Sequence, residues 1–197
     1  MTGRPARAVL GTVFAVAAAI GLSAGCNNRP PTPGAKVQKV ATDLTETAAR
    51  QRITAYLTQT LRALPAGVGL SRRPDNPNLA RLDDGDAAIT VPCDDNDISG
   101  DGPEQVQLGY WVVGVPAGQN SHFFDLIRDA WTGRGFILHP EADSRWAPVF
   151  TPDGYTLVVQ DAGKGDGSLS INTGSPCFPL SGKDATTPQP NELHRPS

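Results

Sequence analysis

The chain has 197 residues, with 17 Lys and Arg against 20 Asp and Glu, and it is rich in Gly (21) and Pro (18). A mildly acidic chain with no cluster of basic side chains is a poor candidate for binding nucleic acid or an anionic lipid surface. The many Gly and Pro residues predict numerous turns and a modest content of regular structure.

The N-terminus has the pattern of an export signal. Arg4 and Arg7 precede an apolar run, and the small residues Ala24 and Gly25 precede Cys26. This order predicts a signal peptide over residues 1–25 and acylation of Cys26, as in the lipobox of bacterial lipoproteins, although Ser23 replaces the usual Leu. The alternative is an uncleaved membrane-spanning helix, because residues 8–25 approach the minimum length for a span. Either way, we expect the rest of the chain at the extracytoplasmic face of the cell membrane.

Composition divides the mature chain into three parts. Residues 26–40 carry the acylated Cys and a polar, Pro-containing segment, which we interpret as a flexible tether. Residues 41–180 are long enough for a single domain with one core. Residues 181–197 contain three Pro and almost no large apolar side chain, which predicts a disordered tail.

Two cysteines remain once Cys26 is assigned to the lipid. In an exported chain, Cys93 and Cys177 are expected to form a disulfide. The alternative is a redox or metal-binding pair, but there is no CxxC motif and no His beside either Cys.

Two segments have helical periodicity. The first runs from about Asp43 to Leu64, with Asp43 and Glu46 arranged as a helix cap and Pro65 ending it. We interpret its arginines, Arg50, Arg52 and Arg62, as its solvated side. The second runs over residues 121–132, capped by Asn120 or Ser121 and ended by Gly133.

Strand patterns fill the rest of the domain. Residues 106–115 form the strongest strand, in which Val106, Leu108, Tyr110, Val112 and Gly114 alternate with Gln107, Gly109, Trp111, Val113 and Val115. Shorter strands are predicted near residue 69 and over residues 87–91, 136–139 and 146–150, and residues 155–160 and 168–172 form a hairpin.

These elements predict an α+β fold: a two-layer sandwich with an antiparallel or mixed sheet, two helices on one face, and one disulfide. Because Cys93 follows the strand over residues 87–91 and Cys177 follows the strand over residues 168–172, we expect these two strands to be neighbours.

Several segments together resemble a known family. The lipobox, the first-helix segment AARQRITAYLTQTLRAL, the mid-chain Cys93 and the late segment SINTGSPCFPL are similar to the LppA-like lipoproteins of mycobacteria and related actinobacteria. The resemblance covers about residues 48–180, and its most specific parts are the first-helix segment and the Thr-Gly…Cys-Phe-x-Leu end. It implies a cell-envelope location and a Cys–Cys bridge, and it implies no activity.

An acidic loop follows Cys93. Asp95, Asp97 and Ser99, followed by Gly100, match the first half of a calcium-binding loop. Val106 stands where the last ligand, a bidentate Glu, is required, so the alternative is a solvated acidic turn. A second group, His139 with Glu141 and Asp143, is interpreted as a surface loop rather than a metal site.

The strongest strand also supplies a candidate binding surface. Tyr110 and Trp111 must lie on opposite faces of the sheet, so one of them faces away from the helices. Together with Val113, that aromatic residue is expected to form a surface for a partner or a lipid, unless a loop or the tail covers it.

No catalytic motif is recognisable. The chain has no GxSxG, HExxH, SxxK or Gly-rich phosphate loop. We therefore expect a non-catalytic, membrane-anchored module without a cofactor that binds an envelope protein, a lipid or a glycan. The alternatives are a carrier or sensor of a small apolar ligand and a calcium-dependent module.

Overall fold

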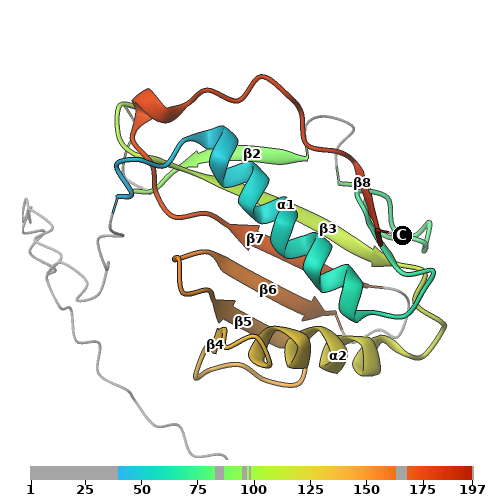
Figure 1. Ribbon diagram of the computed structural model, residues 1–197. Coiled ribbons are helices and arrows are strands. Elements are labelled where there is room, and N and C mark those ends of the chain that lie inside the picture. The colour runs from blue at the N-terminus through green and yellow to red at the C-terminus, as the bar shows by residue number, and fades with distance from the viewer. Residues whose placement is uncertain (1–39, 83–86, 95–96, 98, 163–167, 197) are drawn as a thin grey trace, which may run out of the picture. The chain divides into compact units, whose positions relative to one another are not determined.

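The structure, a computed structural model, describes residues 40–82, 87–94, 97, 99–162 and 168–196. In this part of the chain, eight strands form one antiparallel sheet and two helices pack on one of its faces (Figure 1). The predicted α+β sandwich is confirmed, and all described strand pairs are antiparallel.

The elements follow one another as α1 (Glu46–Ala63), β1 (Gly69–Ser71), β2 (Ala88–Pro92), β3 (Glu104–Val113), α2 (Asn120–Thr132), β4 (Ile137–Leu138), β5 (Trp146–Phe150), β6 (Thr156–Asp161), β7 (Leu169–Gly174), a short 3-10 turn (Leu180–Gly182) and β8 (Glu192–His194). The strand order across the sheet is β4-β5-β6-β7-β3-β1-β8, and β2 also pairs with β3. The hairpin predicted from residues 155–172 is confirmed as β6 and β7.

β3 organises the sheet because it is long enough to pair with three strands. One of its edges pairs with β7, and the other is shared by β2 and, further along, by β1. Its predicted alternation is confirmed, since Val106, Leu108, Tyr110 and Val112 are buried towards the helices. This face forms the core together with the apolar sides of α1 and α2.

The first helix begins later than predicted. Thr45, not Asp43, is the N-cap, and its hydroxyl accepts a hydrogen bond from the Ala48 amide at 3.3 Å. Thr45 has the extended backbone that a cap requires. The prediction that all three arginines of α1 are solvated is wrong for Arg50, which is 8% exposed.

The second helix begins at Asn120, and neither Asn120 nor Ser121 caps it. Asn120 is buried inside the first turn, where its amide donates to Asp161 at 3.4 Å, and the cap position is Gln119. At the other end, the Trp131 indole donates to the Thr60 hydroxyl of α1 at 2.8 Å. This bond satisfies the polar atom of a fully buried Trp and joins the two helices.

The predicted disulfide is present between Cys93 and Cys177. The predicted neighbours are wrong, however, because β2 and β7 lie on opposite edges of β3. The bridge therefore passes over the start of β3, where the backbones of Glu104 and Phe178 also bond to each other.

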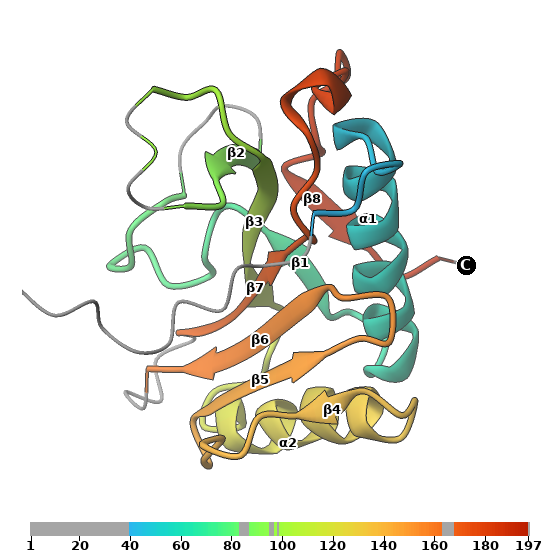
Figure 2. The ribbon, with the colours of Figure 1, turned by 90° about the vertical axis from the view of Figure 1, so that its left-hand side faces the viewer.

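The C-terminal segment is ordered, contrary to the prediction of a disordered tail. β8 pairs with β1, placing Leu193 opposite Leu70, and the Tyr110 hydroxyl donates to the Pro190 carbonyl at 2.5 Å. Figure 2 shows this segment returning past α1 to the edge of the sheet. Composition missed it because the pairing of β8 with β1 is made by backbone groups, for which the polar side chains of this segment give no signal.

Candidate functional site

The face of the sheet away from the helices is the open face, and it carries the exposed apolar side chains of the outer strands. Register places Ile137 of β4 beside Phe150 of β5, and strand alternation places Trp146 on the same side as Phe150. The intervening residues of β5, Ala147 and Val149, point into the core. Ile137, Trp146 and Phe150 thus come from two consecutive strands that pair with each other.

Ile137, His139, Trp146 and Phe150 form what we call the aromatic patch. Ile137 is 68% exposed, Phe150 40% and Trp146 36%. The His139 ring lies between the other two rings, with its centroid 5.9 Å from each. His139 is held there because its amide donates to the Pro148 carbonyl at 2.9 Å, and Pro148 is itself buried.

The three residues predicted to form a binding surface on β3 do not lie on the same face of the sheet. Tyr110 is fully buried on the helix side, so its assignment to a partner surface is wrong. Trp111 and Val113 do point away from the helices, but both are only partly exposed. The Trp111 indole donates to the Ala80 carbonyl at 3.2 Å, so the segment after β1 covers this end of the open face.

Trp146 and Phe150 were identifiable as aromatic residues of a short strand, yet their exposure was not predicted. The signal was the alternation Trp146, Pro148, Phe150 against Ala147 and Val149. It is ambiguous in sequence because both sets are apolar, and only the position of β5 near the sheet edge decides which set is covered.

A cleft of about 390 Å³, lined by both polar and apolar side chains, lies on the open face near β2. Its lining includes Gln107, Asn172 and the exposed Ile89. Gly109 lies in its floor and leaves room for the Asn172 side chain, whose oxygen would lie 2.7 Å from a Cβ at this position. The cleft therefore combines amide, arginine and apolar groups, whereas the aromatic patch carries no arginine or amide side chain.

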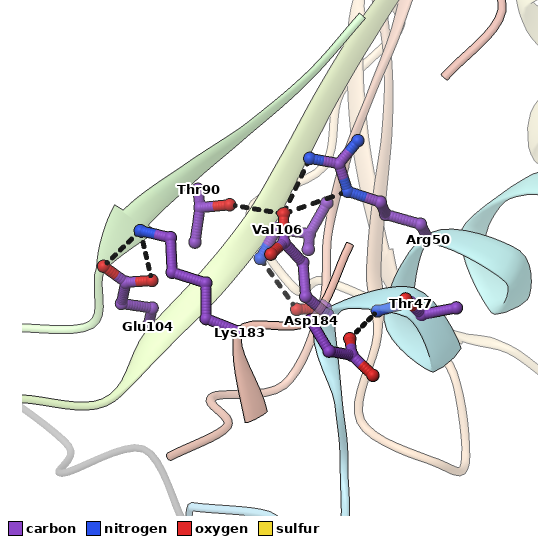
Figure 3. A network of polar contacts seen from close by, with 9 residues as sticks. Thr47, Arg50, Thr90, Glu104, Val106, Lys183 and Asp184 are labelled. Atoms are coloured by element: carbon purple, nitrogen blue, oxygen red, sulfur yellow. Dashed lines mark hydrogen bonds and ion pairs between the residues drawn. The ribbon is translucent and has the colours of Figure 1, made fainter. Parts of the chain in front are cut away.

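A polar network beneath the start of α1 is structural (Figure 3). Glu46, which is 4% exposed, accepts hydrogen bonds from Arg50 at 2.6 and 3.1 Å and from the Thr90 hydroxyl at 3.0 Å. Lys183 pairs with Glu104 at 3.1 Å, and Asp184 accepts from the Thr47 amide at 2.9 Å. These contacts join α1, β2, β3 and the C-terminal segment.

A second cluster joins α1 to the turn between β5 and β6. The Asp153 carboxylate accepts hydrogen bonds from Tyr56 at 2.5 Å, Thr151 at 2.6 Å and Arg52 at 2.8 Å. Burial alone raises the pKa of Asp153, but these three donors outweigh it and lower the pKa below its usual value. Burial also raises the pKa of the neighbouring Tyr155 to about 12. The carboxylate therefore connects the turn to α1.

The residues considered for metal binding are used by their own loops. Asp95 lies outside the described residues. Asp97 accepts hydrogen bonds from Ser99, Gly100 and Gly102, and these donors lower its pKa. The His139 ring accepts from the Glu141 amide. Among the described residues, no group of three or more His, Cys, Asp or Glu side chains could hold a metal ion.

Comparison with protein-family models, with curated proteins and with solved structures finds no match to this chain. Cys26 and the signal segment lie outside the described residues, so acylation stays a prediction. No helix in the described part of the chain is both long and apolar enough to cross a membrane.

Proposed function

We propose that the chain is an exported lipoprotein, anchored by an acylated Cys26, whose domain is a non-catalytic binding module. The partner is a component of the cell envelope, a protein, lipid or glycan, and it binds at the open face of the sheet. The aromatic patch replaces the surface expected on β3 as the place of contact.

The observation that carries this proposal is the exposure of Ile137, Trp146 and Phe150 on one face. Single exposed apolar residues are ordinary, whereas grouped ones mark an interaction surface. Aromatic side chains also dominate the energetics of interfaces, because each brings a large area at a low cost in side-chain entropy.

The two polar clusters that involve α1 favour a binding role over catalysis. The Glu46 and Asp153 carboxylates each accept hydrogen bonds that connect α1 to other elements, which is a structural use. The carrier alternative gains no support either, because fully buried Trp131, Tyr110 and Phe124 fill the described space between sheet and helices.

Site-specific photo-crosslinking in the producing cell tests the proposal. A photoreactive amino acid at Phe150 of the full chain should yield a discrete adduct, while the same group at the exposed Arg62 of α1 should not. Mass spectrometry of the adduct identifies the class of partner. Equal adducts from both positions, or none from Phe150, would contradict a binding role for the patch.

The anchor is tested separately in the same cells. Cys26→Ala should abolish metabolic lipid labelling and either release the chain or leave it as an unprocessed precursor. Unchanged labelling of the variant would exclude Cys26 as the acylated residue.

A further inference from the structure

We propose that the aromatic patch docks the domain against the lipid–water interface of the same membrane that holds its anchor. The partner is thus the bilayer surface itself, contacted by Ile137, Trp146 and Phe150. The inference rests on the proposed lipid anchor, and it assigns an occupant to the aromatic patch.

The position of the tether carries the argument. Val40, the first described residue, lines the same hollow of about 650 Å³ as Phe150 and Thr156. The backbone there is fixed, because the Ala41 amide donates to the Cys177 carbonyl at 2.8 Å. The chain therefore enters the domain beside the aromatic patch.

The length of the tether limits how far the patch can be from the bilayer. Residues 27–39 separate Cys26 from Val40. Thirteen residues span at most about 45 Å even when fully extended. An anchored domain thus presents the patch to the bilayer at a high effective concentration, so a weak surface affinity is sufficient.

The chemistry of the patch suits an interface rather than a hydrocarbon interior. Trp and other aromatic side chains with a polar tip collect at the headgroup level of membranes, where one end is apolar and the other is wet. Trp146 offers an indole N–H in this way, and the adjacent His139 ring adds a second polar group. Ile137 and Phe150 supply purely apolar surface beside them.

The charges near the patch are balanced. Exposed Arg134 and Arg145 and exposed Glu141 and Asp143 flank it in sequence. With residues 1–25 removed, the chain keeps 15 Lys and Arg against 20 acidic residues, a net charge of −5. Attraction to anionic headgroups is therefore absent as a driving force, and the docking is expected to depend little on salt.

The test anchors the chain chemically, so that it does not depend on acylation in the cell. The mature chain from residue 26 is coupled through the Cys26 thiol to a maleimide lipid in phosphatidylcholine vesicles, since Cys93 and Cys177 are bridged. Vesicles carrying dibrominated phosphatidylcholine then quench only those Trp residues that lie at the bilayer. Comparison with Trp146→Phe isolates the signal of Trp146 from those of Trp111 and Trp131.

Trp146 should be quenched, at low and at high salt alike, and Ile137→Ser with Phe150→Ser should remove most of this quenching. The matched control is Ile89→Ser, an apolar position outside the aromatic patch whose exposure (56%) lies between those of Ile137 and Phe150, and it should leave the quenching unchanged. Melting temperatures verify that each variant is folded.

Unquenched Trp146 in the coupled chain would overturn the docking proposal. If crosslinks from Phe150 in cells then led to a protein or a glycan, the binding module would stand with a different partner. Conversely, quenching of Trp146 together with unchanged lipid labelling of Cys26→Ala would support the affinity of the patch and contradict the natural anchor.

Discussion

At the scale of single residues, the Glu46–Arg50 pair shows how the tail changes the surroundings of α1. Both side chains are nearly inaccessible, and Thr90 of β2 completes the hydrogen bonding of Glu46. Their spacing of four residues suits an ion pair on one side of a helix, although the sequence pattern predicts Glu46 at the cap and Arg50 on the solvated side. Burial could not be predicted, because residues far along the chain lie beside this turn: Asp184 accepts a hydrogen bond from the Thr47 amide, and residues 185–190 line a pocket together with Arg50.

Glu46→Ala is expected to lower the free energy of unfolding by about 3–5 kcal/mol, because Arg50 keeps its buried charge and loses its carboxylate partner. Urea denaturation at neutral pH measures the change. Gln51→Ala, at an exposed position of the same helix, serves as the control and should stay within about 0.5 kcal/mol of the parent. If the two variants unfolded at the same urea concentration, the pair would contribute little.

At the scale of elements, the sequence predicts the regular patterns of the strands but not the pairing of strands that are far apart in the chain. The alternation of β3, the hairpin of β6 and β7, and the disulfide all follow from local composition or from cysteine number. The pairing of β1 with β8 does not, because two three-residue strands carry too few side chains to specify a register. The aromatic patch was missed for a related reason, since strand position, and not strand sequence, sets its exposure.

Removing residues 185–197 should expose the edge of β1. The Arg72 amide, which donates to the Asn191 carbonyl at 2.9 Å, should then exchange its hydrogen about tenfold faster or more, which corresponds to ~1.4 kcal/mol. Hydrogen–deuterium exchange read by NMR follows this amide, and the β6–β7 ladder provides protected reference amides. An unchanged rate at Arg72 would mean that β8 does not stabilise this edge.

At the scale of the whole domain, one covalent link closes most of the sheet. The Cys93–Cys177 bridge encloses β3 to β7 and α2 in a single loop, with a sequence separation of 84. In the chain-entropy account, a loop of this length stabilises the fold by about 4–5 kcal/mol. That is a large share of the roughly 5–15 kcal/mol typical of a domain.

Cys93→Ser combined with Cys177→Ser should therefore lower the free energy of unfolding by about 4–5 kcal/mol, because the unfolded chain gains the conformations that the loop excludes. Denaturation in urea gives the value, and reduction of the parent with a thiol should reproduce it. Cys26→Ser, outside the loop, is the control and should not alter stability. A double variant as stable as the parent would show that the noncovalent contacts suffice.

The pairing of β8 with β1 also sets an order of events in biosynthesis. A chain is made from its N-terminus, so β1 is complete long before its outer neighbour β8, which follows all the other described strands of the sheet. Until then, one edge of the growing sheet has no strand beside it. With only three residues, β1 offers a newly made neighbour few backbone groups to capture, which limits premature association between nascent chains.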